Sequence, residues 1–388
     1  MCRELFGICK CVSYSIKYTK LRDWIPFDKL RWDGLSNNPN AINILEKNLD
    51  KLDEDCWETL SQNPNVINIL EKIKKKEKGK IKKSKKKTHL DKLNWYRFSE
   101  NPNVIPILEQ NLDKVCWTCI CKNPNAVHII KKNLDKLDEY GWCKLSKNPN
   151  AIYILEKNLD KVDWDMLSQN PNAIHILEKN LDKVDWDMLS QNPNAIHILE
   201  KNLDKVDWYT LSINPNAIHI LEKNLDKMNW EWLCSNPNAI HILEKNLDKV
   251  HWIDLSMNKN AIRILEKNLD KVKWWGLSMN INAIHILEKN LDKLDEACWR
   301  ELSQNENAIR ILEKNLDKVV WDHLSMNRNA IHILEKNLDK VDWYWLSRNP
   351  NIFTYDYEAI KKHMYKDDGF VEELMANRFH PKNMQKWN

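Results

Sequence analysis

A 22-residue unit recurs along almost the whole of this chain. Two adjacent copies read WDMLSQNPNAIHILEKNLDKVD and begin at Trp164 and Trp186. A fixed period of this length predicts repeats that each pack mainly on their neighbours, so the 388 residues form one repeat domain instead of two or three globular ones. Each unit begins with an anchor tryptophan, and the units are numbered 1 to 14 by these anchors, at positions 32, 57, 95, 117, 142, 164, 186, 208, 230, 252, 274, 299, 321 and 343.

Each unit predicts two short helices. The first covers little more than one turn, from Trp164 to Gln169, and can be either α or 3₁₀. Asp163 precedes it and is a good N-cap. The second helix is expected to begin at the Asn170-Pro171 step, because asparagine caps helices well and proline is tolerated at the first helical position. Apolar residues then follow at helical spacing, which predicts one buried stripe per unit.

The fold class predicted from this pattern is an all-α solenoid of about fourteen units of 22–25 residues. Stacked at usual helix packing distances, the units would form an elongated rod or superhelix of about 130 Å along its path. Residues 1–27 lie outside the period and are expected to form an N-terminal segment or cap before the solenoid of residues 28–350. Residues 351–388 are expected to form a helical C-terminal cap, because a terminal repeat needs a polar outer face.

Two departures from the consensus bear on packing. Four late units replace the proline of Asn-Pro-Asn, with Lys259, Ile281, Glu306 and Arg328, yet keep both asparagines. This predicts that the amides themselves form a hydrogen-bonded ladder between units. Three units have 25 residues, and their extra residues precede the anchor tryptophan, where a longer connecting loop is tolerated.

The junction LSQNPNAIHILEKNLDKV loosely resembles the leucine-rich variant repeat, a solenoid of alternating α and 3₁₀ helices. The unit more closely resembles the Trp/Asn-Pro repeats of giant DNA viruses such as the mimiviruses. The tail NPNIFTYDYEAIKKHMYKDDGFVEELMANRFHPKN resembles an ending that many of those proteins share. Together the two motifs cover roughly residues 28–383. The resemblance implies a viral origin and a place in the host cytoplasm or the viral factory.

Nothing in the sequence favours an enzyme. It contains no phosphate loop, hydrolase elbow or kinase signature, and near-identical repeats give no residue the special surroundings that catalysis requires. The first twenty residues lack the apolar core of a signal peptide, and no segment approaches the ~18 apolar residues of a membrane span. We therefore expect an intracellular protein with no cofactor, no resident metal and no membrane contact. The function predicted is a non-enzymatic protein–protein interaction scaffold.

The candidate partner-binding residues come from variation inside the repeat. The positions one, two and five after each anchor tryptophan change freely, and we call them the variable positions. They include aromatic residues out of phase with the anchors, namely Trp232, Trp275, Trp345, Tyr209 and Tyr344. Exposed aromatic side chains often anchor protein partners. The alternatives are drift at unconstrained positions and packing between neighbouring units.

A lysine-rich run interrupts unit 2 between residues 72 and 88 and is expected to be a disordered loop. Its densest part contains Lys82, Lys83, Lys85, Lys86 and Lys87. It could act as a nuclear-import signal or contact nucleic acid through phosphates. The alternative is a solvated insertion without a role. A nucleic-acid-associated protein and a purely structural spacer therefore stay open as alternative functions.

Cysteine and histidine give weaker signals. The ten cysteines are best explained as buried reduced thiols, although two clusters could supply metal ligands: Cys2, Cys9 and Cys11, and Cys116, Cys119 and Cys121. Histidine recurs at one position of the second helix: His128, His175, His197, His219, His241, His285 and His332. This row is expected to be a solvated polar face, with a pH-sensitive stripe as the alternative.

Overall fold

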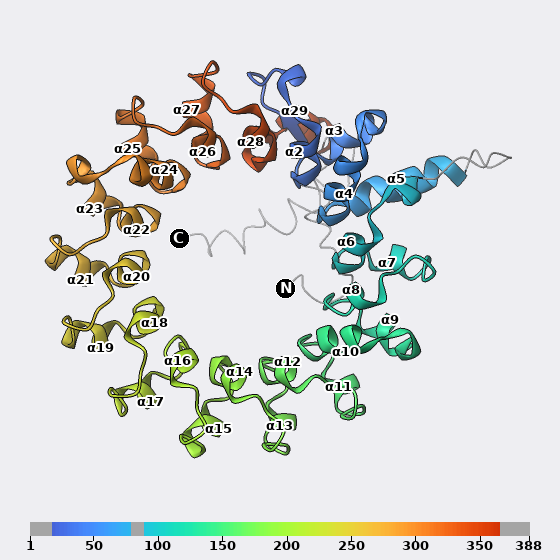
Figure 1. Cartoon of the computed structure of the whole chain (residues 1–388). Coiled ribbons are helices and arrows are strands. Elements are labelled where there is room, and N and C mark those ends of the chain that lie inside the picture. The colour runs from blue at the N-terminus through green and yellow to red at the C-terminus, as the bar shows by residue number, and fades with distance from the viewer. Residues whose placement is uncertain (1–17, 79–88, 365–388) are drawn as a thin grey trace, which may run out of the picture.

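The computed structural model describes residues 18–78 and 89–364 and consists of two concentric layers of short helices (Figure 1). The inner layer holds the first helix of each unit: α2 (Trp32–Asn37), α4 (Glu54–Gln62), α6 (Trp95–Glu100), α8 (Trp117–Ile120), α10 (Glu139–Ser146), α12 (Trp164–Ser168), α14 (Trp186–Gln191), α16 (Trp208–Leu211), α18 (Trp230–Ser235), α20 (Trp252–Met257), α22 (Trp274–Met279), α24 (Glu296–Gln304), α26 (Trp321–Met326) and α28 (Trp343–Arg348).

The outer layer holds the second helix of units 1 to 13: α3 (Ile42–Lys47), α5 (Val66–Lys78), α7 (Ile105–Leu108), α9 (Val127–Lys131), α11 (Ile152–Leu155), α13 (Ile174–Leu177), α15 (Ile196–Lys201), α17 (Ile218–Glu222), α19 (Ile240–Lys245), α21 (Ile262–Lys267), α23 (Ile284–Glu288), α25 (Ile309–Lys314) and α27 (Ile331–Glu335). Short 3₁₀ turns accompany them: η1 (Phe27–Lys29), η2 (Leu49–Lys51), η3 (His89–Lys92), η4 (Leu134–Lys136) and η5 (Leu291–Lys293). The all-α solenoid is confirmed.

The solenoid closes into a ring. Helix α2 of unit 1 packs on α28 of unit 14 as well as on α4 of unit 2 (Figure 1). Unit 14 has no second α-helix; in its place are η6 (Pro350–Ile352) and strand β2 (Phe353–Tyr355). Strand β2 pairs antiparallel with β1 (Thr19–Leu21), with Leu21 opposite Phe353. The chain is therefore a closed ring and not the elongated rod that was one of the two predicted shapes, because the rotation between successive units brings the two ends together.

The C-terminal segment was expected to cap an open end, but there is no open end to cap. Its described part begins with β2, which fastens the ring closure, and continues into α29 (Tyr357–Met364). The second helix expected after residue 369 lies outside the described residues.

An asparagine ladder joins the units, as the recurrence of both asparagines in units without the proline predicted. In unit 6, Asn170 Nδ2 donates to two carbonyl oxygens of unit 5, those of Ser146 at 2.9 Å and Asn148 at 3.1 Å. The second asparagine, Asn172, donates from Nδ2 to the Pro149 oxygen at 2.9 Å. These acceptors are backbone atoms, so the ladder persists where proline is replaced, as in the 3.0 Å bond from Asn282 to the Lys259 oxygen.

The ring closure repeats this ladder bond for bond. Asn38 Nδ2 donates to the Ser347 oxygen at 3.0 Å and the Asn349 oxygen at 2.9 Å. Asn40 Nδ2 donates to the Pro350 oxygen at 3.0 Å. The Arg31 N–H donates to Ser347 Oγ at 2.9 Å, as the N–H before an anchor tryptophan does at most internal junctions. Unit 1 therefore follows unit 14 in the same register in which unit 7 follows unit 6.

Local helix boundaries agree with the sequence in part. Asp163 caps the first helix by accepting a 2.9 Å bond from the Met166 N–H, and that helix is α. The second helix starts at Ile174, three residues later than expected. Asn170 is not its N-cap, because its Oδ1 accepts from the Asn172 N–H and its Nδ2 is engaged in the ladder. The Asn-Pro-Asn step is thus a turn between the helices.

The core lies between the two layers. In unit 7 it contains Leu189 from the inner helix and Ala195, Ile198 and Leu199 from the outer one, all at most 3% exposed. Most anchor tryptophans are half-buried and pack against this core from its edge. A lysine of the same unit covers many of the indole rings, as Lys205 covers Trp186 with Nζ 5.2 Å from the ring centroid. Such cation–π contacts each contribute about 0.5–1 kcal/mol at exposed sites.

Two kinds of insertion, the extra residues of the three long units and the lysine-rich run, differ from their expected form. The extra residues of the three long units do not form loops; they extend the first helix at its N-terminus, as in α4, which begins at Glu54 and is capped by Asp53. The lysine-rich run begins as helix, because α5 continues to Lys78. Lys82, Lys83, Lys85, Lys86 and Lys87 lie outside the described residues.

Candidate interaction surface on the inner wall

The variable positions face the inside of the ring. At about 100° per residue, positions one and five after the anchor tryptophan lie about 160° from the buried leucine, whereas position two lies about 100° from it, on the flank that faces the preceding unit. The buried leucine points outward to the core, since the first helices form the inner layer (Figure 1). The inner wall is therefore lined by the residues in which the units differ most.

Three of the five predicted aromatic residues are at position one and lie on this wall, and Trp232 and Trp345 are at position two, on its flank. Trp275 (42% exposed), Tyr209 (46%) and Tyr344 (37%) present large apolar surfaces. Trp232 and Trp345 are half-buried. The wall also carries Ile253 and Met279, exposed residues that aromatic composition alone did not single out.

Neighbouring units touch through these residues. The Tyr209 ring lies 4.2 Å from the Trp232 ring of the next unit, centroid to centroid. Tyr344 meets Trp345 edge to face at 4.9 Å, and the Arg348 guanidinium lies 5.3 Å from the Trp345 ring centroid. Packing between units thus accounts for part of the variation and holds Tyr209 in place, whereas Tyr344 is held by contacts inside unit 14; both rings stay exposed.

Charge divides the inner wall into two parts. We call the variable positions of units 6 to 11 the acidic–apolar arc. It contains the carboxylates Asp165, Asp187, Glu231 and Asp254, with no lysine or arginine at any variable position. In the remaining units the variable positions include both acidic and basic residues. Some of these form ion pairs between units, as in the 2.7 Å bond from Lys122 to Glu100. The arc alone presents an excess of negative charge beside apolar side chains.

Two carboxylates of the arc are electrostatically unfavourable. The pKa of Asp165 is raised above its ordinary value by burial and then by repulsion from Asp185 and Asp163. The pKa of Asp187 is raised in the same way, by burial and by Asp207 and Asp185. Crowded carboxylates of this kind favour a cationic partner, which would relieve their repulsion.

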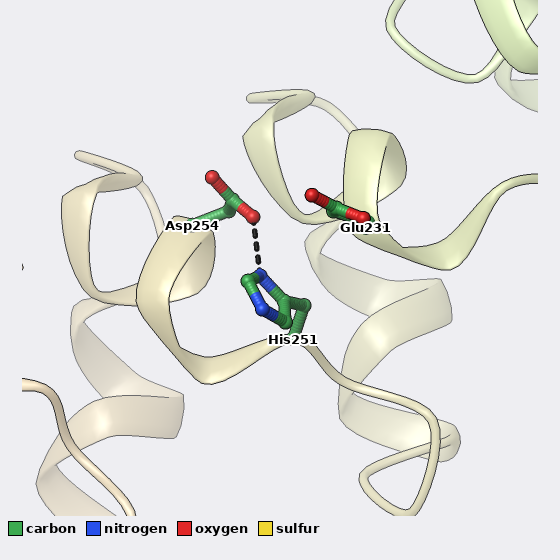
Figure 2. Close-up of side chains that lie close together, drawn as sticks. All are labelled: Glu231, His251 and Asp254. Atoms are coloured by element: carbon green, nitrogen blue, oxygen red, sulfur yellow. Dashed lines mark hydrogen bonds and ion pairs between the residues drawn. The ribbon is translucent and has the colours of Figure 1, made fainter.

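A cluster of three potential metal ligands lies within the arc (Figure 2). Glu231 on α18 and His251 and Asp254 on or beside α20 each offer one ligand atom, and these atoms lie within 4.8 Å of one another. His251 Nδ1 is 2.5 Å from Asp254 Oδ2. Within residues 18–78 and 89–364, no other group of three such side chains is as close. We did not expect this cluster, although one signal was present: His251 stands where several other units have a capping aspartate or asparagine.

The histidine row lies on the outer layer and is a paired surface. Each histidine Nε2 lies 2.5–2.9 Å from a glutamate Oε1 of the preceding unit, as His241 does with Glu222. Both side chains of each pair are roughly half exposed. The row is therefore a polar, solvent-facing set of links between second helices.

The predicted cysteine clusters have different outcomes. Cys2, Cys9 and Cys11 lie outside the described residues. Cys116 and Cys119 form a disulfide across one helical turn, so they are neither free thiols nor free ligands in this structure. Cys121 is buried, and burial raises the pKa of its thiol to about 12. Cys56, Cys234 and Cys298 are likewise buried free thiols.

No family model matches the chain, and neither a curated protein nor a solved structure matches it significantly. In the part of the chain that the structure describes, no helix is long and apolar enough to cross a membrane.

Proposed function

We propose that the ring is a non-enzymatic protein–protein interaction scaffold that binds an apolar, basic protein segment on its inner wall, in the acidic–apolar arc. The observation that carries the proposal is the coincidence of exposed aromatic side chains and carboxylates without a lysine or arginine among them, at positions that the repeat does not constrain. The other surface positions repeat from unit to unit and offer less on which specificity could depend.

The ring supports this role physically. Aromatic side chains provide most of the binding energy in many interfaces, and Tyr209, Trp232 and Trp275 are close enough along the arc to serve one partner. Closure fixes the two ends of the solenoid to each other, so the wall loses little conformational entropy on binding. The carboxylates add long-range attraction for a cationic segment and select against an acidic one.

The experiment compares two amphipathic helical peptides that share an apolar face and differ in carrying lysines or glutamates on the polar face. The wild-type chain is expected to bind the lysine peptide more tightly. Replacing Tyr209 and Trp275 with threonine, as in Thr118, and Trp232 with methionine uses residues that other units have at these positions. Loss of one hot-spot side chain costs about 2 kcal/mol or more, roughly 30-fold in affinity, so the triple variant is expected to lose measurable binding.

The matched control is Tyr153→His, which removes an equally exposed aromatic side chain from the outer layer and restores the common repeat residue. It is expected to bind the lysine peptide as the wild type does. Equal binding of the two peptides, or unchanged binding by the triple variant, would refute the proposal and favour a structural spacer.

The viral origin implied by the repeat, with a place in the host cytoplasm or viral factory, is part of the same proposal. The alternative role in nucleic-acid association depends on residues 72–88. Deleting them is expected to leave peptide binding unchanged, whereas a salt-sensitive loss of nucleic-acid retention would favour the alternative.

A further inference from the structure

The cluster of Glu231, His251 and Asp254 lies at the junction of units 9 and 10, where the sequence departs from the repeat. Position one after the anchor carries a glutamate in unit 9, and position two carries an aspartate in unit 10. The residue before the unit 10 anchor is histidine instead of a capping aspartate or asparagine. His251 and Asp254 are three residues apart in unit 10, and the stacking of α18 on α20 brings Glu231 of unit 9 beside them.

The local structure of α20 reflects the change. In unit 8, Asp207 accepts a 2.6 Å bond from the Thr210 N–H and so caps the first helix. His251 makes no capping bond, and its ring turns instead toward Asp254 (Figure 2). An N-cap bond stabilises a helix by about 1 kcal/mol. The junction gives up this stabilisation and gains a nitrogen donor beside two carboxylates.

We infer that Glu231, His251 and Asp254 form a binding site for a divalent transition-metal ion of the zinc type. One imidazole nitrogen and two carboxylate oxygens suit zinc and its first-row neighbours, whereas calcium and magnesium prefer oxygen ligands alone. In a tetrahedral zinc site the bonds are about 2.0–2.1 Å long, which places donor atoms about 3.3 Å apart. The side chains are solvent-accessible, with His251 44% and Asp254 21% exposed, so small rotations can bring the donors to these distances.

Binding requires no redox step. A neutral imidazole offers the metal its unprotonated nitrogen, so for binding through His251 Nδ1 the ring proton is carried by Nε2; if it is on Nδ1 when no ion is bound, solvent takes that proton and supplies one to Nε2, with no net release. The three side chains fill three coordination positions. The remaining positions face the interior of the ring, where water or a donor atom of a bound partner can occupy them.

The outer-face histidines provide an internal comparison. His241 also lies 2.5 Å from a carboxylate, that of Glu222, and is similarly exposed. It has no third donor within the same distance. A two-donor pair of this kind binds a metal ion more weakly than a three-donor cluster.

The test titrates the full chain with Zn²⁺ in competition with a chromophoric chelator, and repeats the titration with Co²⁺ to read the ligand type. The wild type is expected to bind one equivalent of zinc that His251→Asn and Glu231→Gln each weaken by at least about tenfold. His251→Asn is compatible with folding, because Asn229 occupies the same position in unit 9 and caps its helix. The cobalt spectrum of the lost equivalent is expected to lack thiolate charge transfer, which excludes the cysteines as its ligands.

The matched control is His241→Asn, the same substitution on the outer face, where other units carry Asn43 and Asn68. This variant is expected to keep the zinc equivalent. Far-ultraviolet circular dichroism of each variant is expected to match the wild type, because the substituted side chains are partly exposed and their loss removes little packing. The inference is overturned if His251→Asn and Glu231→Gln bind zinc as the wild type does, or if His241→Asn removes the same equivalent.

Discussion

Closure of the ring predicts that Asn38, a buried asparagine of unit 1, contributes as much to stability as the equivalent asparagines of the middle units. Asn38 is 0% exposed, and Nδ2 bonds two carbonyl oxygens of unit 14. Its Oδ1 accepts a third bond from the Asn40 N–H at 3.0 Å. In an open solenoid the first two partners would be absent, and the side chain would lie at a solvated end.

The expected cost of Asn38→Ala follows from these bonds. Each lost hydrogen bond contributes about 1 kcal/mol, so removal of three costs about 3 kcal/mol. The Ser347 and Asn349 carbonyls lose a partner in a buried place, which can raise the cost to about 5 kcal/mol. An open solenoid would lose only the local bond to Asn40, about 1 kcal/mol.

The control is Asn192→Ala at the junction of units 6 and 7. Asn192 is 1% exposed and makes equivalent bonds, to the Ser168 oxygen at 2.9 Å and the Asn170 oxygen at 3.1 Å. Any cavity left by the substitution is the same in both variants. The ratio of the two effects therefore reports closure alone.

Urea unfolding followed by tryptophan fluorescence measures the change in the free energy of unfolding for each variant. Hydrogen exchange then measures local opening of α2 and α28, which is expected to be slow in the wild type and fast in Asn38→Ala. The reasoning fails if Asn38→Ala costs 1 kcal/mol or less while Asn192→Ala costs 3 kcal/mol or more, or if α2 and α28 exchange rapidly in the wild type.

Three further predictions follow from single residues. Leu199→Ala is expected to destabilise the ring by about 2–5 kcal/mol in urea unfolding, because Leu199 is 0% exposed between the layers; a cost below 1 kcal/mol would contradict the assigned core. The Cys56 thiol, whose pKa burial raises to about 12, is expected to resist iodoacetamide at pH 8 until urea unfolds the chain; rapid labelling of the native chain, read by mass spectrometry, would contradict its burial. Asp165→Asn and Asp187→Asn are expected to stabilise the ring at pH 7, because a raised carboxyl pKa means that the charged form is disfavoured in the folded state. The gain in stability should vanish below the ordinary pKa of 3.8, where the carboxyl group is neutral in both the folded and the unfolded state. Urea midpoints that show no gain at pH 7, or the same gain at pH 3, would contradict this.

The sequence predicted most of the local structure because the same capping, buried and amide positions recur in unit after unit. The capping aspartates, the buried leucine and the paired asparagines were all predicted and confirmed. The start of the second helix was predicted wrongly, because Asn170 was read as an N-cap when its amide is used between units. A side chain with two competing uses cannot be assigned from its neighbours in sequence alone.

The candidate site was predictable only in part, for a related reason. The aromatic residues stood out because they differ in type from the rest of the repeat, and Trp275, Tyr209 and Tyr344 are exposed on the inner-layer helices. Glu231, His251 and Asp254 did not stand out, since each is an ordinary polar substitution when read alone. His251 and Asp254 are close in sequence, but only the stacking of α18 on α20 adds Glu231 to them.

The sequence by itself determined the unit: its two helices, its buried stripe, its ladder of amides and the positions free to vary. The tertiary structure decided how the units add up. A rotation of about 26° per unit closes fourteen units into a ring, and a slightly different rotation would give an open superhelix. That angle is the sum of many small packing contacts between side chains, so the period does not specify it. Because the solenoid closes, the variable positions lie on the inner face of a ring.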